Sequence, residues 1–256
     1  MRIFSSHVGQ VSWPVLRRRV ARPTLSLGIA VLFAAPSIAA TVEGKISLTG
    51  SRQTTARKQD LSGVVIWLEG QPAEPLPPAS RTIQMVQKTK KFTPHVLAIP
   101  VGSTVDFPNF DPIFHNAFSN FAGQPFDTGL YPPGATHKIR FRRDGVVRVF
   151  CNIHPTMSAV IVVLKSPYFT STNVAGEFKI TGVQPGEYQL RVFHERATPE
   201  TLNALERKVA LTDGPLSLPE ISISESGYIE GAHKNKHGFD YPPAADDQAL
   251  YPGARR

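Results

Sequence analysis

One seven-residue segment, Cys151-Asn152-Ile153-His154-Pro155-Thr156-Met157, contains three side chains of types that bind soft metal ions. A thiolate, an imidazole and a thioether form a ligand set suited to copper, and blue-copper centres place two imidazoles and one thiolate in a plane with a long axial bond to methionine. Because Cu(I) and Cu(II) prefer different geometries, a short loop stiffened by proline keeps rearrangement small and electron transfer fast. The segment therefore predicts most of a copper site and requires a second histidine from elsewhere.

His115 is the best-placed donor of that second imidazole. It follows the predicted strand Ser103–Phe107, and the ends of neighbouring strands bring such loops together at one end of a sandwich. The backbone N–H of Asn116 is placed to tune the thiolate by hydrogen bonding. Cys151 is the only cysteine, which excludes a disulfide framework, a CxxC redox pair and a dinuclear centre bridged by two thiolates.

Strand signals dominate the rest of the chain, because short apolar or alternating runs are separated by turn residues such as Gly102 and Asp144-Gly145. The predicted strands are Val42–Leu48, Val64–Leu68, His95–Ile99, Ser103–Phe107, His137–Phe141, Val146–Phe150, Ala159–Leu164, Glu177–Ile180, Tyr188–Val192, Lys208–Leu211 and Glu220–Ile223, with one short helix near Pro199–Leu205. Many short strands at this spacing predict an all-β protein built of antiparallel sandwiches.

The stretch from about residue 84 to 165 resembles the cupredoxins, with an upstream His-Asn pair and the short ligand-loop spacing of amicyanin. Phe92, Pro94, Gly102 and Asn109 also match the cupredoxin pattern. The resemblance implies a Greek-key sandwich that binds one type 1 (blue) copper ion. It implies His115, Cys151 and His154 as equatorial ligands, Met157 as the axial ligand and the edge of His154 as the electron exit. The whole chain is similar to exported proteins labelled methylamine-utilisation or plastocyanin-like.

The segments on either side of this stretch resemble the two halves of a small carboxypeptidase-regulatory-like (transthyretin-like) β-sandwich. The second half carries the recognisable part, residues 175–190, in which Phe178, Ile180, Tyr188 and Leu190 alternate into a core. We expect the copper module to be inserted between the two halves; the rival order is sequential, with 41–165 and 166–225 as separate domains. Similar sandwiches, of the carbohydrate-binding-like fold, bind sugars or act as spacers, and a spacer or docking role is the better expectation here.

The expected organisation begins with a signal peptide, since three consecutive arginines precede the apolar stretch Leu25–Ala35 and the small residues Ser37–Ala40. The rival interpretation is a membrane anchor, but the apolar stretch is short for a span. The predicted parts are residues 1–40 as signal peptide, 41–83 as the first part of the flanking sandwich, 84–165 as the cupredoxin domain, 166–225 as the second part of the sandwich and 226–256 as a flexible tail. We expect a periplasmic protein with no membrane span after cleavage.

Charge gives no reason to expect a nucleic-acid partner. The net charge is +8, but the first 40 residues hold five of the 28 basic side chains and no acidic one, so the remaining 216 hold 23 basic against 20 acidic side chains. The leading functional hypothesis is a non-enzymatic carrier of single electrons between transient redox partner proteins. Copper storage or delivery, a copper oxidase or reductase, and a cell-envelope binding module without an electron-carrier role remain as alternatives.

The other histidines receive structural interpretations. His95 lies at the start of a predicted strand and is expected to be structural rather than a fifth ligand, and His137 is expected on a strand surface. His194 is expected to donate a hydrogen bond to a loop. His233 and His237, in the lysine-rich tail, are expected to be solvated.

Overall fold

The structure is a computed structural model that describes residues 39–50, 59–70, 83–120, 123–229 and 233–241. The predicted signal peptide lies outside these ranges, apart from its last two residues, and so does the distal part of the predicted tail. No helix within the described residues is long and apolar enough to cross a membrane.

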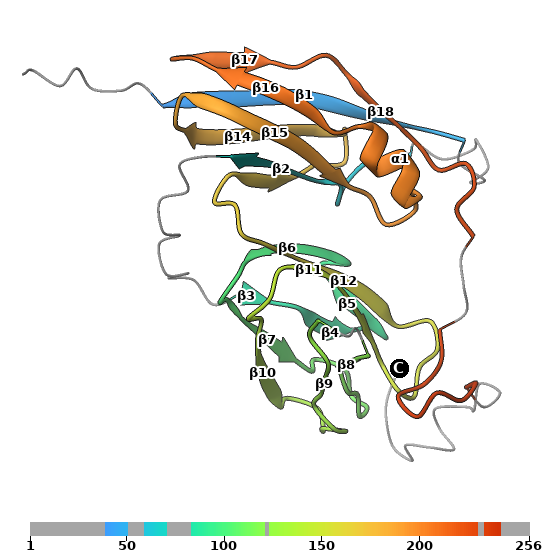
Figure 1. Ribbon diagram of the computed structural model, residues 1–256. Coiled ribbons are helices and arrows are strands. Elements are labelled where there is room, and N and C mark those ends of the chain that lie inside the picture. Colours follow the sequence, from blue (N-terminus) through green and yellow to red (C-terminus); the bar gives the residue numbers. More distant parts are fainter. Residues whose placement is uncertain (1–38, 51–58, 71–82, 121–122, 230–232, 242–256) are drawn as a thin grey trace, which may run out of the picture. The chain divides into compact units, whose positions relative to one another are not determined.

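The predicted all-β class is confirmed (Figure 1). Only one helix, α1 (Pro199–Ala204), lies in the described parts of the chain, where Thr198 caps its first turn. The strands are β1 (Ala40–Thr49), β2 (Val65–Gly70), β3 (Ile83–Gln84), β4 (Val86–Lys88), β5 (Lys91–Thr93), β6 (Val96–Pro100), β7 (Thr104–Pro108), β8 (Phe118–Ser119), β9 (Phe126–Asp127), β10 (Thr136–Arg140), β11 (Gly145–Phe150), β12 (Ser158–Leu164), β13 (Phe169–Ser171), β14 (Glu177–Val183), β15 (Gly186–Phe193), β16 (Arg207–Leu211), β17 (Pro215–Ser217) and β18 (Ile221–Ser224).

The first two strands pair with strands from the last third of the sequence. One sheet has the order β14-β1-β17, with β18 also on β1, and the other has the order β13-β2-β15-β16. In the register, Val42 lies opposite Ile180 and Leu68 lies opposite Leu190. These side chains belong to one buried apolar cluster. Such pairings are what the nested arrangement requires, and we propose that arrangement as the domain organisation.

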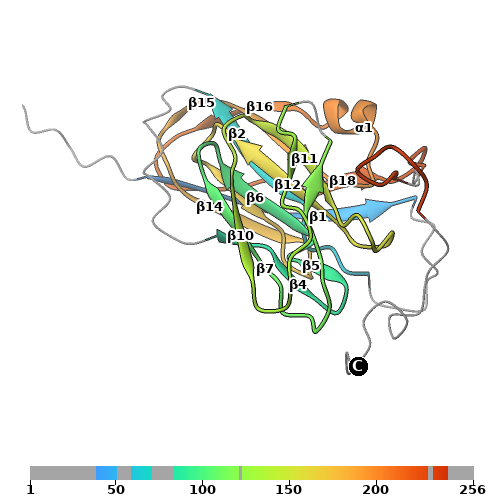
Figure 2. The same ribbon diagram turned by 90° about the horizontal axis from the view of Figure 1, so that it is seen from below.

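The intervening segment forms its own sheets, with orders β6-β12-β11-β8-β9 and β10-β7-β3 and the hairpin β4-β5. Figure 2 shows β6, β12 and β11 side by side. Alternating apolar residues of these strands fill a second core, in which Phe107, Phe141 and Ile161 are fully buried. Cys151 and Met157 lie in the same cluster. The predicted ligand loop is therefore rooted in the core of this sandwich.

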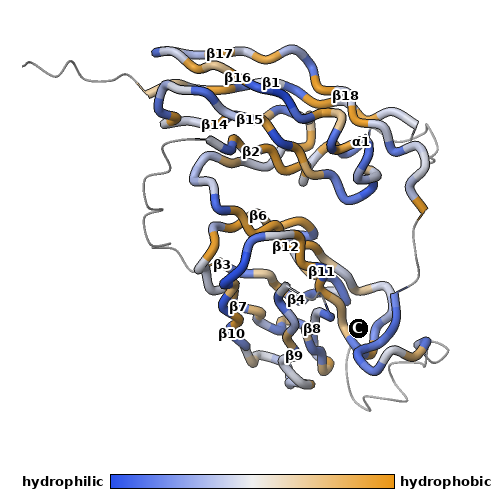
Figure 3. Tube along the Cα trace, in the orientation of Figure 1, coloured by the Kyte–Doolittle hydropathy of each residue, from blue (hydrophilic) through white to orange (hydrophobic). Residues whose placement is uncertain are grey.

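β12 contributes to two cores, because both of its faces are apolar (Figure 3). Ala159, Ile161 and Val163 pack in the cluster that contains Cys151. Val160, Val162 and Leu164 point to the opposite face and pack with Val65 of β2 and Phe193 of β15. A continuous apolar run is the pattern expected of a strand that is covered on both faces.

An ion pair joins residues from the two sets of sheets. Nε2 of His95 lies 2.5 Å from Oε2 of Glu195, and Arg148 approaches the other oxygen at 3.4 Å. The hydrogen bond to Glu195 raises the pKa of His95, although burial opposes this. Burial acts to raise the pKa of Glu195, but the hydrogen bond and charge of His95 lower it overall.

Substitution Glu195→Gln is expected to remove a pH-dependent part of the stability. Because the pKa of His95 is raised on folding, the pair stabilises the wild type fully below pH 6.5, and this contribution is lost as pH rises through the folded pKa. His95 is half exposed, so screening limits the contribution to about 0.5–1 kcal/mol. Urea unfolding of the copper-free protein at pH 5.5 and pH 9 measures it. Substitution of the exposed Glu187 by Gln is the control. A loss of unfolding free energy in E195Q, relative to the wild type, that is equal at both pH values contradicts the prediction.

Candidate metal centre

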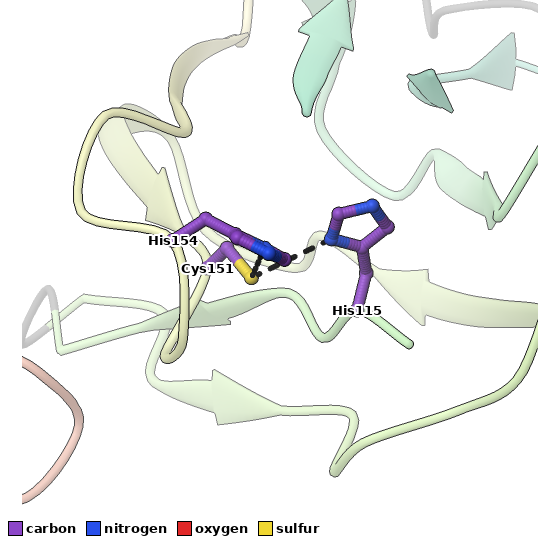
Figure 4. A group of neighbouring side chains, drawn as sticks. All are labelled: His115, Cys151 and His154. Atoms are coloured by element: carbon purple, nitrogen blue, oxygen red, sulfur yellow. Dashed lines mark hydrogen bonds between the residues drawn. The ribbon is translucent and has the colours of Figure 1, made fainter. Parts of the chain in front are cut away.

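His115, Cys151 and His154 converge on one buried point (Figure 4). One donor atom from each lies within 4.8 Å of the others. The sulfur of Cys151 is 3.8 Å from Nδ1 of His115 and 3.5 Å from Nδ1 of His154. The two imidazole rings are 4.7 Å apart between centroids and inclined at 60°. The sequence-predicted histidine from the upstream loop is thus brought to the cysteine loop.

The tight loop between β11 and β12 positions Cys151 and His154. Phe150 and Ser158 pair at the end of the antiparallel ladder, so the residues between them must turn sharply. The N–H of Cys151 donates to the carbonyl oxygen of Met157 at 3.0 Å, and the N–H of Met157 donates to that of His154 at 3.0 Å. The side chain of Met157 is fully buried in the cluster that contains Cys151. These bonds fix the loop without help from a metal.

Asn116 ties the histidine loop to the cysteine loop. Its side-chain oxygen accepts a hydrogen bond from the N–H of Asn152 at 2.7 Å, and its amide group donates to Asp127 at 3.2 Å. Its backbone N–H also faces the sulfur of Cys151. The same residue therefore holds the two loops at a fixed separation and donates a hydrogen bond to the thiol, as the sequence predicted.

The thiol of Cys151 is buried, and burial raises its pKa. The backbone N–H groups of Asn116, Ile153 and His154 act in the opposite direction, because they stabilise the thiolate. A cation held by these residues would favour the thiolate further, and its binding would release the thiol proton.

The ring of His115 is held on both sides. Its Nδ1 faces Cys151, and its Nε2 lies 2.7 Å from Oδ2 of Asp111. The ring is fully buried and Asp111 nearly so. Burial acts to raise the pKa of Asp111, but hydrogen bonds from the backbone N–H groups of Lys90 and Thr89 and from His115 lower it overall. Both oxygens of Asp111 thus accept hydrogen bonds from backbone N–H groups, and Oδ2 is also placed to accept one from Nε2 of the imidazole.

The residues present fit a soft or borderline metal ion. Two imidazole nitrogens and one sulfur, converging in a buried and preformed site, are the donors that copper and zinc select. Met157 follows in the same loop as a candidate fourth ligand.

A segment near the C-terminus lies against the cysteine loop; we call residues 233–241 the C-terminal strap. The ring of His233 stacks on Phe150, with centroids 4.1 Å apart, and its Nε2 donates to the carbonyl oxygen of Pro155 at 2.6 Å. The hydroxyl of Tyr241 donates to the carbonyl oxygen of Cys151 at 2.7 Å. Residues 233–241, predicted to belong to a flexible tail, thus make specific contacts with the cysteine loop.

Lys236 fastens the middle of the C-terminal strap. Its backbone N–H donates to the side-chain oxygen of Asn152 at 2.9 Å, and its ammonium group lies 2.7 Å from Asp127. The strap therefore contacts the loop before and after His154. That histidine, whose edge the resemblance implies as the electron exit, has 7% of its surface accessible.

None of the other histidines in the described ranges belongs to the donor cluster. His95 pairs with Glu195, which agrees with its expected structural role. His194 is bound to Glu225 at 2.7 Å, and His137 packs against Tyr131. His233, expected to be solvated, instead belongs to the strap. Asp111 was not predicted as part of the site. The available signal was a carboxylate four residues before His115.

No protein-family profile matches this chain, and no curated protein is significantly similar to it. Solved structures that resemble part of it include cupredoxins and a copper-containing nitrite reductase. A purple cupredoxin from Nitrosopumilus maritimus is 26% identical over 32% of this chain and 99% of its own, with a TM-score of 0.30. A copper-containing nitrite reductase from Thermus scotoductus is 28% identical over 36% of this chain and 25% of its own, with a TM-score of 0.32. An amicyanin variant is 18% identical over 39% of this chain and 98% of its own, with a TM-score of 0.32.

Proposed function

We propose that this chain is an exported mononuclear type 1 copper protein that carries single electrons between redox partners. The observation that carries the proposal is the buried convergence of His115, Cys151 and His154 within 4.8 Å. His115, Cys151 and His154 would be the equatorial ligands and Met157 the axial one. When bound, the copper supplies a one-electron couple.

The chain's own residues supply rigidity around that couple. Hydrogen bonds within the loop fix Cys151 relative to Met157, and Asn116 fixes the distance between the two loops. Since the ligand positions are held by the protein, little reorganisation accompanies electron transfer. Backbone N–H groups that face the sulfur tune the potential by withdrawing charge from the thiolate.

The alternatives make different demands on the chain. Storage or delivery of copper favours exposed methionine- or histidine-rich ligands, whereas the sequence has three methionines and the histidines of the centre are buried. An oxidase or reductase uses further copper ions, and the described residues hold no second cluster of histidine, cysteine and acidic donors. A binding module on a cell-envelope complex, with the copper secondary, stays as the runner-up.

The proposed partners are redox proteins that bind transiently, and the proposed compartment is the periplasm. The arginine-rich start, the short apolar stretch and the small residues that follow it support export. Transient electron-transfer encounters bury little surface and dissociate quickly.

Cyclic voltammetry of the copper-reconstituted mature protein tests this function. We expect a reversible one-electron wave, and steady-state assays with oxygen and with nitrite are expected to show no turnover. A zinc-loaded sample is the matched control, because zinc has no redox chemistry and occupies the same donors. Copper that binds without a reversible wave contradicts the carrier proposal and favours the binding module, and turnover of either substrate favours an enzyme.

A further inference from the structure

A hairpin turn 22 residues upstream of Asp111 holds the carboxylate that touches His115. The turn between β4 and β5 places Thr89 and Lys90 at φ values of 53° and 54°. Non-glycine residues rarely adopt this left-handed conformation. Here it directs two successive backbone N–H groups at one acceptor. The N–H of Thr89 donates to Oδ1 of Asp111 at 2.5 Å, and that of Lys90 donates to Oδ2 at 2.8 Å.

A second anchor acts on the backbone of Asp111. The side-chain oxygen of Asn109 accepts the N–H of Asp111 at 3.0 Å, and its amide group donates to the carbonyl oxygen of Ile113 at 2.8 Å. Asn109 is fully buried. The carboxylate is thus fixed from the hairpin on one side and from its own loop on the other.

This fixed carboxylate selects one tautomer of His115. Both oxygens of this carboxylate accept backbone N–H groups, so it acts as an acceptor, and the proton of a neutral imidazole must sit on Nε2, which lies 2.7 Å from Oδ2 of Asp111. The lone pair is then on Nδ1, the nitrogen that faces the sulfur of Cys151. In the opposite tautomer, the proton on Nδ1 would point toward Cys151 and the metal position. The unprotonated Nε2 would then face the carboxylate of Asp111, so that two hydrogen-bond acceptors would lie against each other.

We propose that Asp111, held by the Thr89–Lys90 turn, is a positioning residue that fixes the ligating tautomer of His115 and favours Cu(II) over Cu(I). This inference rests on the proposed copper function. The negative carboxylate makes the imidazole a stronger donor, and the more highly charged Cu(II) gains more from that donor than Cu(I) does. The carboxylate therefore lowers the reduction potential of the centre.

Asp111→Asn tests the effect on potential. Loss of an outer-shell partner of this kind costs about 10–100-fold in metal affinity. If that loss falls on Cu(II) alone, the midpoint potential rises by about 59–118 mV, at 59 mV per tenfold for a one-electron couple. The matched control is Asp106→Asn, which neutralises a second buried aspartate that is paired with Lys138 and contacts none of the three donor residues. Equal potentials for D111N and D106N overturn the proposal.

Nitrogen NMR of the histidine rings in the copper-free wild type provides a readout that needs neither a variant nor copper. For the neutral ring of His115, we expect the proton to lie on Nε2. A proton on Nδ1, or a mixture of tautomers, overturns the proposal even if D111N fails to fold. A fixed Nε2 proton in a protein that shows no reversible copper wave would instead refute the proposed function and leave the positioning role of Asp111 intact.

Discussion

Substitution Cys151→Ser is expected to abolish the intense visible absorption of the copper-loaded protein. That band arises when the thiolate transfers charge to Cu(II), and the serine hydroxyl offers no equivalent donor. The EPR spectrum is expected to change from small to ordinary copper hyperfine splitting. The Cu(II) affinity is expected to fall by more than the ~10–100-fold that loss of an outer-shell partner costs, because a direct ligand is removed. Absorption and EPR spectra of both proteins, each loaded with Cu(II), measure the effect.

Thr156→Ala provides the control for this substitution, since Thr156 is an exposed residue of the same loop. Its spectrum should match that of the wild type. A pale copper spectrum in the wild type that Cys151→Ser leaves unchanged would show that the thiolate is not a ligand. The convergence of His115, Cys151 and His154 would then require another explanation.

Truncation after Ile229, which removes the C-terminal strap, is expected to accelerate electron exchange by about ten- to hundredfold. Hydrogen bonds contribute about 1 kcal/mol each, and the cost of ordering the segment offsets part of that sum. Opening of the strap therefore costs on the order of 1–3 kcal/mol. At 1.4 kcal/mol per factor of ten, a partner that docks over His154 encounters an open loop in only about one molecule in ten to one in a hundred.

The rate at which the copper-loaded protein exchanges electrons with an excess of one external redox protein measures this effect, with the midpoint potential recorded beside it. Truncation after Tyr241 is the matched control, because it shortens the chain and retains the strap's contacts with Phe150, Cys151 and Pro155. That control should exchange electrons at the wild-type rate. An unchanged or slower rate after the longer truncation would mean that the strap does not cover the docking surface.

The strand framework and the three converging donors were predictable from local pattern. Apolar alternation identified β7 and a continuous apolar run identified β12, each to within a residue or two, because both strands are long enough to show a pattern. The spacing of Cys151 and His154 in a loop between two strands predicted that their side chains would meet. β8 and β9 were missed, since two-residue strands carry no periodicity.

The supports of the centre were not predictable in the same way. The carboxylate of Asp111 depends on a turn at Thr89 and Lys90, neither of which is a typical residue for positive φ. His233 donates one hydrogen bond to Pro155, 78 residues earlier in the chain, and stacks its ring on Phe150. Polar sequence without periodicity looks like a free tail, because contacts of this kind depend on the folded surface and not on local pattern.

The two apolar faces of β12 have a consequence for cooperativity. Ile161 packs in the core that holds Cys151, whereas Val160 and Val162 on the same strand pack with Val65 and Phe193. Unfolding of either core therefore removes β12 residues from the packing of the other core. An ion bound at one end of β12 would therefore raise the free energy of unfolding of both sandwiches. Thermodynamic linkage requires this of any ligand that binds only the folded state.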